Sequence, residues 1–155
     1  MKILMVCLGN ICRSPMAEGI MRSKIEKYKL SAEVDSAGFE SFHTGDPPDF
    51  RAIREMKRHG IDITQQKSRL FRKSDFDAFD RIYVMDSGNY NDVRSAAHHP
   101  DQMKKVDYIL NVLYPGSNKP VPDPYYGGDD GFSNTYKLLD SATELIALEL
   151  KNGGK

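Results

Sequence analysis

The chain has no tryptophan, only two cysteines and no excess of charge of either sign among its 155 residues. Lysine plus arginine and aspartate plus glutamate number 22 each, so bulk electrostatic attraction to nucleic acid or to anionic membranes is not expected. The mean hydropathy is −0.56, and no apolar run reaches the length of a membrane span. We therefore expect no nucleic-acid partner and no membrane partner, and any anion must be recognised by a local site.

The two cysteines, Cys7 and Cys12, both lie near the N-terminus. Two cysteines cannot build a disulfide framework, and a structural zinc site usually needs four ligands, so we expect neither a metal nor another cofactor. The apolar run after Lys2 is too short for a secretory signal, which favours a cytoplasmic protein. A regulatory bond between Cys7 and Cys12 and simple packing of Cys12 under its loop are both open interpretations.

The apolar pattern alternates predicted strands with predicted helices, and the chain length suits one domain spanning residues 1–155. This order predicts a single-domain, three-layer α/β fold, with a four-stranded parallel sheet and helices on both faces. The predicted strands are 2–7, 32–36, 81–85 and 105–110, the predicted helices are 15–28, 49–59, 87–97 and 133–151, and a long loop covers 114–132.

Residues 7–15, Cys-Leu-Gly-Asn-Ile-Cys-Arg-Ser-Pro, connect the first strand to the first helix. Pro15 suits the first position of that helix, and Ser14 suits its N-cap. The N–H groups of such a loop can converge on one point, where the helix N-terminus adds partial positive charge. Arg13 adds planar donors that match two phosphate oxygens, so the segment predicts a phosphate site.

The same positive field acts on Cys7 and favours its thiolate, which is the nucleophilic form of the side chain. Ser14 is placed to donate a hydrogen bond to the sulfur. Gly9 supplies backbone freedom, and Asn10 tolerates a left-handed conformation or locks the loop through side-chain hydrogen bonds. A strand-terminal cysteine is otherwise a small buried apolar residue. The Cys-x5-Arg-Ser-Pro context favours chemistry here.

A second chemical group is predicted in the long loop, where Asp123 stands in Pro-Asp-Pro-Tyr-Tyr at 122–126. A phosphate ester leaves faster when its leaving oxygen is protonated, and Asp123 is the candidate acid. Alone, an aspartate between prolines is usually a turn former. Ligands of open parallel sheets lie at the carboxyl ends of strands, where Cys7, Asp86 and this loop are all expected.

These segments resemble the low-molecular-weight protein tyrosine phosphatases over nearly the whole chain. The 6–15 segment looks like the signature of that family and 123–127 like its general-acid loop, while Asp35 to Gly38 and Met85-Asp86 are similar to strand ends of the family. The resemblance implies a protein-tyrosine-phosphatase that works through a cysteinyl-phosphate, with Cys7 as nucleophile, Arg13 on the phosphate and Asp123 as general acid and base. The substrate-binding residues implied are Leu8, Gly9, Asn10, Ile11, Cys12, Ser14, Phe42, His43, Tyr125 and Tyr126.

The implied partners are tyrosine-phosphorylated proteins, kinases among them, with inorganic phosphate or other oxyanions in the loop. Three positions depart from the family pattern and leave the peptide preference open. Phe42 stands where the family often has tryptophan, and His43 stands at a variable position. Gln66 appears where animal relatives have a histidine that braces the loop asparagine.

Three rival functions share this pattern. Relatives that act on phosphoarginine tend to carry threonine at the place of Ile11 and to lack the tyrosine pair, so Ile11 with Tyr125 favours phosphotyrosine. An arsenate reductase on the same fold uses further cysteines, and none follows Cys12. The intact set of Cys7, Arg13 and Asp123 argues against a phosphoprotein-binding module without turnover.

Overall fold

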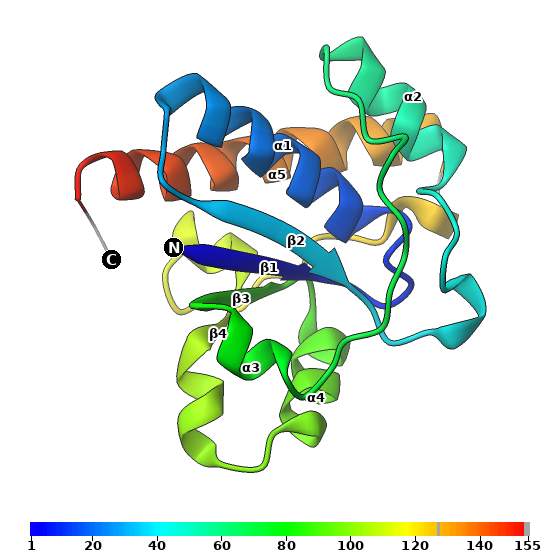
Figure 1. The fold of residues 1–155 in the computed structure, drawn as a ribbon. Helices are drawn as coiled ribbons and strands as arrows, with labels where there is room; N and C mark the ends of the chain where they lie inside the picture. The colour runs from blue at the N-terminus through cyan, green and yellow to red at the C-terminus, as the bar shows by residue number, and fades with distance from the viewer. Residues whose placement is uncertain (127, 154–155) are drawn as a thin grey trace.

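The computed structural model describes residues 1–126 and 128–153, with residues 126 and 129 described through their backbone only. Its centre is a sheet of four parallel strands in the order β2-β1-β3-β4 (Figure 1). The strands are β1 (Lys2–Val6), β2 (Glu33–Ala37), β3 (Arg81–Val84) and β4 (Val106–Tyr108). The predicted four-stranded parallel sheet is confirmed.

Helices cover both faces of the sheet, which makes three layers (Figure 1). One face carries α1 (Arg13–Tyr28), α2 (Phe50–Arg58) and α5 (Asp129–Lys151), and the other carries α3 (Asp75–Ala78) and α4 (Ser87–Ala96). Successive side chains of a strand point to opposite faces. Accordingly, Ile3 and Met5 belong to the core beneath α1 and α5, whereas Leu4 and Val6 belong to the second core beneath α3 and α4.

The strand order brings three chain segments to one edge of the sheet. From β1 the chain continues to β2 on one side, while β3 lies on the other side, so Val6 pairs with both Ala37 and Val84. The residues that follow these three strands therefore meet at one place. Ligand sites of open α/β sheets form where the strand order reverses in this way. That geometry brings Cys7, Gly38 and Asp86 together.

The ends of some elements differ from the sequence-based expectation. The first helix begins at Arg13 with Cys12 as its N-cap, so Ser14 is not the N-cap and Pro15 is the third helical residue. The last helix begins at Asp129, so the predicted loop is shorter than 114–132. Short 3-10 helices appear that the sequence did not predict, because a single turn carries no apolar period. These are η1 (Ser41–His43), η2 (Pro100–Lys105), η3 (Ile109–Val112) and η4 (Pro124–Tyr126). One of them begins at Ile109, so the last strand, predicted over 105–110, already ends at Tyr108.

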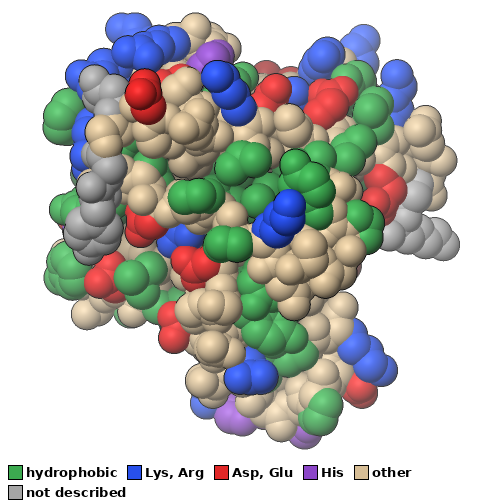
Figure 2. All heavy atoms as spheres, turned by 180° about the vertical axis from the view of Figure 1, so that it is seen from behind, with side chains coloured by type: hydrophobic (Ala, Val, Ile, Leu, Met, Phe, Trp, Pro, Cys, Tyr) green, Lys and Arg blue, Asp and Glu red, His purple; other side chains and the backbone are tan. Residues whose placement is uncertain are grey.

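Charged side chains of both signs alternate over the face shown in Figure 2, interrupted by apolar groups. This mixture matches the equal numbers of acidic and basic residues in the sequence. None of the described helices combines the length and the apolar character that crossing a membrane requires. Specific recognition of a charged ligand therefore depends on a local pocket rather than on a surface charge of one sign.

Candidate active site

A pocket opens at the carboxyl ends of β1 and β3, next to the N-terminus of α1. It brings together segments that are far apart in the sequence, namely the 7–13 loop, the 40–43 segment and the loop before α5. The residues that line it are Cys7, Leu8, Gly9, Ile11, Cys12, Arg13, Glu40, Phe42, His43, Asp123 and Tyr125.

The sulfur of Cys7 lies at the base of this pocket, and the residue is only 3% exposed. Ser14 gives it two contacts: the hydroxyl oxygen lies 3.0 Å from Sγ, and the backbone N–H donates to Sγ over 3.5 Å. Asn10 Nδ2 donates to the same hydroxyl oxygen at 2.8 Å, which leaves the hydroxyl proton of Ser14 for the sulfur. Two donors aimed at one sulfur stabilise its anionic form.

Arg13 is buried to the same extent, and its two terminal nitrogens have different partners. Nη1 donates to Asp86 Oδ2 and to the carbonyl oxygen of Val121, both at 2.8 Å. Nη2 lies 3.6 Å from Asp123 Oδ2 across the pocket. Asp86 also caps α4 by accepting from the N–H of Asn89, so it orients the guanidinium and does more than end a strand. One nitrogen anchors Arg13, and the other faces the site.

Asp123 lines the same pocket but is far more exposed than Arg13, with 35% of its side chain accessible against 3%. Its Oδ1 accepts a hydrogen bond from the N–H of Tyr125 at 3.0 Å, and Pro122 and Pro124 flank it in the chain. The loop thus holds a carboxyl group in the same pocket as the buried thiol and 3.6 Å from the Arg13 guanidinium. A proton donor in this place can reach the outer oxygen of an anion bound over the sulfur.

The second cysteine has a different environment. Both Cys7 and Cys12 are free thiols, and both line the pocket. Burial raises the pKa of the Cys12 thiol, and the negative charges of Asp49 and Cys7 raise it further. Cys12 therefore stays protonated at neutral pH, which makes Cys7 the better nucleophile. A bond between the two cysteines stays a prediction.

The backbone of the loop is held by Asn10, a buried residue with φ of 56°. Its Oδ1 accepts from the N–H of Arg69, and its Nδ2 donates to Ser14 and Ser36. Asn10 thus both adopts the left-handed conformation and locks the loop, as the sequence suggested. The side chains of Asn10 and Ser14 act behind the loop and do not line the pocket.

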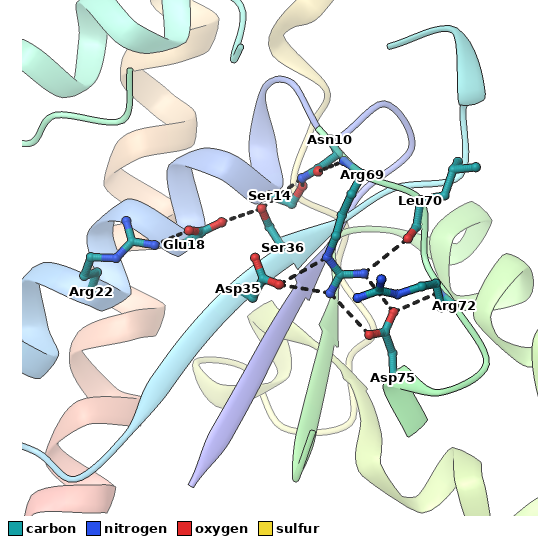
Figure 3. Close-up of polar contacts among 10 residues, drawn as sticks. All are labelled: Asn10, Ser14, Glu18, Arg22, Asp35, Ser36, Arg69, Leu70, Arg72 and Asp75. Carbon is teal, nitrogen blue, oxygen red and sulfur yellow. Dashed lines mark hydrogen bonds and ion pairs between the residues drawn. The ribbon is translucent and has the colours of Figure 1, made fainter. Parts of the chain in front are cut away.

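Arg69 is itself held in place by two carboxylates (Figure 3). Its guanidinium donates to Asp35 from Nε and Nη2 and to Asp75 from Nη1, at 3.0 to 3.1 Å. The sequence predicted none of these roles, because the three residues are distant in the chain. Gln66 does not brace Asn10. Its amide atoms are buried and have no hydrogen-bond partner in the described part of the chain.

Exposed apolar side chains form the rim of the pocket. Phe42 is 72% exposed and lies against His43, with ring centroids 4.1 Å apart. Leu8 and Tyr125 are also exposed, and the Arg51 guanidinium lies over the Tyr125 ring. The side chain of Tyr126 lies outside the described residues. Glu40 lines the pocket too, and sequence reasoning missed it because an acidic residue in a loop carries no distinctive pattern.

Gly38 is required by the close approach of the 7–13 loop. A Cβ there would lie 2.8 Å from the carbonyl oxygen of Leu8 and 2.9 Å from the backbone nitrogen of Asn10. We expect Gly38→Ala to lower the free energy of unfolding by about 1–3 kcal/mol, measured by urea denaturation, because backbone atoms must shift. Gly131→Ala is the control, since its Cβ would meet nothing closer than 3.5 Å. Equal stability of the two variants would contradict the close approach.

Comparison with known proteins gives consistent matches. The sequence matches the family described as low molecular weight phosphotyrosine protein phosphatase over residues 2–155. It is 42% identical over 149 residues to the low molecular weight phosphotyrosine protein phosphatase of Schizosaccharomyces pombe, covering 94% of each chain. A crystal structure of a protein tyrosine phosphatase from Entamoeba histolytica superposes with a TM-score of 0.91 at 37% identity, covering 99% of this chain and 98% of that one. The YwlE arginine phosphatase superposes with a TM-score of 0.86 at 26% identity, covering 97% and 96%.

Proposed function

Because this chain belongs to the low molecular weight phosphotyrosine protein phosphatase family, we propose that its pocket hydrolyses phosphotyrosine through a cysteinyl-phosphate on Cys7. The protein is a protein-tyrosine-phosphatase, a hydrolase of phosphoric monoesters, and phosphorylated proteins are its substrates. One observation carries the assignment of roles: a buried thiol, a buried guanidinium and an exposed carboxyl group line the same pocket.

In the first step, the Cys7 thiolate attacks phosphorus, and the bond from phosphorus to the tyrosine oxygen breaks. Arg13 Nη2 and the loop N–H groups hold the phosphoryl oxygens and stabilise their charge in the transition state. Asp123 transfers its proton to the departing oxygen, which leaves as a neutral phenol. Arg13 Nη2 and Asp123 Oδ2 lie 3.6 Å apart, which is longer than a hydrogen bond. A phosphoryl oxygen of the substrate can therefore take the place of the carboxylate next to Nη2.

In the second step, water attacks the phosphorus of the cysteinyl-phosphate. Asp123, now a carboxylate, accepts a proton from that water, and the bond from sulfur to phosphorus breaks. The departing sulfur leaves as a thiolate, which the hydroxyl and N–H groups of Ser14 stabilise. Inorganic phosphate is released, and Asp123 is protonated again for the next cycle.

Phosphotyrosine is the substrate that the rim of the pocket favours. Leu8, Phe42 and Tyr125 offer apolar surface at the entrance, where a phenyl ring can pack once its phosphate is seated. Ile11, a half-buried residue of the loop that lines the pocket, presents no polar group to a guanidinium. Phosphoserine has no ring to bury, and phosphoarginine needs polar partners for its nitrogens.

A panel of peptides tests this preference. Three peptides of one sequence, carrying phosphotyrosine, phosphoserine or phosphoarginine, should differ in kcat/KM by about 10–100-fold in favour of phosphotyrosine, because only that side chain buries an aromatic ring. Phosphate release under steady-state conditions is the measurement. A phosphoarginine peptide hydrolysed as fast as the phosphotyrosine peptide would favour the arginine phosphatase alternative. Binding of the phosphotyrosine peptide without turnover would favour a binding module.

We also propose that the protein acts in the cytoplasm on tyrosine-phosphorylated proteins, kinases among them, away from membranes. Its only two cysteines are free thiols, which suits a reducing compartment, and Cys7 must be reduced to act. Fractionation of cells that express the tagged chain tests the location.

A further inference from the structure

A line of polar side chains is buried behind the nucleophile loop (Figure 3). It begins at the surface with Arg22 and Glu18 on α1, which form an ion pair. Glu18 Oε1 accepts from the hydroxyl of Ser36 on β2 at 2.6 Å, and Ser36 Oγ accepts from Asn10 Nδ2 at 2.9 Å. Asn10 then contacts Ser14, which contacts the Cys7 sulfur. A continuous hydrogen-bonded line thus joins a carboxyl group on α1 to the nucleophile.

The direction of each hydrogen bond is fixed by groups that can only accept or only donate. The N–H of Arg69 donates to Asn10 Oδ1, so Nδ2 is the end of the amide that faces the two serines. Nδ2 can only donate, and Ser36 must therefore send its own proton elsewhere. The Glu18 carboxylate, which can only accept when ionised, is the partner that takes it.

From Glu18 inward the line is buried, so each polar group in it depends on its partner inside the protein. Glu18 is 5% exposed, and Asn10, Ser14 and Ser36 are buried as well. Burial raises the pKa of the Glu18 carboxyl, while the hydrogen bond from Ser36 and the charge of Arg22 lower it. The net shift of the Glu18 pKa is upward, and its acceptor role follows from its contacts: Oε1 accepts from Ser36 and Oε2 accepts from Arg22. No other described residue forms a hydrogen bond or ion pair with this carboxylate.

We propose that Glu18 is a positioning residue for the Cys7 nucleophile, acting through Ser36 and Asn10. This inference rests on the proposed function of Cys7. Because Glu18 Oε1 takes the proton of Ser36, Ser36 Oγ is left to accept from Asn10, and the left-handed Asn10 is held with Nδ2 toward Ser14. Ser14 then keeps its proton for the sulfur, in the ground state and when the thiolate departs from phosphorus.

Glu18→Gln tests the inference with almost no change in volume. The glutamine amide must turn its NH₂ group toward either Ser36 or Arg22, and both side chains donate to Glu18 in the unchanged protein. The variant therefore loses either the hydrogen bond from Ser36 or the contact with Arg22. We expect kcat for para-nitrophenyl phosphate to fall about tenfold with KM changed less than about twofold, because the lost interaction supports the thiolate rather than substrate binding. Alkylation of Cys7 by iodoacetate should also require a higher pH than in the unchanged protein.

Two further variants make the test specific. Glu26→Gln changes an exposed glutamate on the same helix and should leave kcat and the alkylation profile unchanged. Arg22→Gln removes the half-exposed cation that faces Glu18 and should shift both readouts in the direction of Glu18→Gln, by a smaller factor. If Glu18→Gln does not fold, Arg22→Gln tests the inference instead. The Arg22 side chain is 42% exposed, so we expect its replacement to leave the fold intact.

The outcomes separate this inference from the proposed function. A Glu18→Gln protein that melts at a lower temperature but keeps the kcat and alkylation profile of Glu26→Gln overturns the inference, because the residue would then serve stability alone. A rise in KM with unchanged kcat overturns it as well. If the unchanged protein hydrolyses no aryl phosphate, the proposed function fails, and the alkylation profiles still decide whether Glu18 acts on Cys7.

Discussion

Replacing Cys7 by serine is expected to lower phosphoester hydrolysis at least about 10⁴-fold while leaving phosphate binding nearly unchanged. In the proposed mechanism the sulfur is the atom that bonds to phosphorus, and a serine hydroxyl in its place stays protonated near neutral pH. Phosphate affinity depends instead on Arg13 and the loop N–H groups, which the substitution leaves in place. Initial rates with para-nitrophenyl phosphate give the first quantity, and calorimetric titration with inorganic phosphate gives the second.

Cys12→Ser is the matched control, because Cys12 lies in the same loop and lines the same pocket. Burial raises the pKa of Cys12, so its thiol is protonated and contributes no nucleophile. Its replacement should change the hydrolysis rate less than about tenfold, since only packing under the loop is altered. If Cys12→Ser lost as much activity as Cys7→Ser, the assignment of the nucleophile would be wrong.

The fold was predictable because its signals are local and periodic. The apolar runs at β1 and β3 are short and continuous, as buried parallel strands are, and each soon meets a residue that interrupts it, Gly9 after β1 and Asp86 after β3. Knowing that two such strands are parallel is enough to place Cys7 and Asp86 at one edge. The register that pairs Val6 with Val84 then brings Asp86 within 2.8 Å of Arg13.

The support behind the site was not predictable in the same way, because it joins residues that carry no common motif. Glu18, Ser36 and Arg69 come from a helix, a strand and a loop, and only the folded chain places them on Asn10. The expected N-cap role of Ser14 was wrong for a related reason. A serine before a helix is an ordinary cap, but here its hydroxyl lies between Asn10 and the sulfur.

The second large effect is expected from Asp123→Asn, and it should depend on the leaving group. The kcat/KM value reports formation of the cysteinyl-phosphate, the step in which the acid protonates the leaving oxygen. For a phosphotyrosine peptide, whose phenol has a pKa of about 10, we expect a loss of about 10²–10³-fold. The nitrophenolate ion is a far better leaving group, so the loss with para-nitrophenyl phosphate should be much smaller. Steady-state kinetics with both substrates measure the difference.

Asp130→Asn is the control, since Asp130 is an exposed aspartate that follows the same loop and does not line the pocket. It should leave both substrates unaffected. Equal losses with the two substrates in Asp123→Asn would contradict the acid role, because a carboxyl group that merely shapes the loop cannot distinguish one leaving group from another.

The same substitution should have an opposite effect on the binding of inorganic phosphate. Asp123 Oδ2 lies 3.6 Å from Arg13 Nη2, the nitrogen that faces the pocket, so an ionised Asp123 competes with phosphate for that cation. Asparagine removes the competing charge and the repulsion between two anions, and product inhibition by phosphate should become stronger above the pH at which Asp123 ionises. Loss of the proton donor should slow formation of the cysteinyl-phosphate and tighten the binding of inorganic phosphate. Damage to the pocket would instead lower both the rate of that step and the affinity for phosphate, so the two measurements together distinguish the two causes.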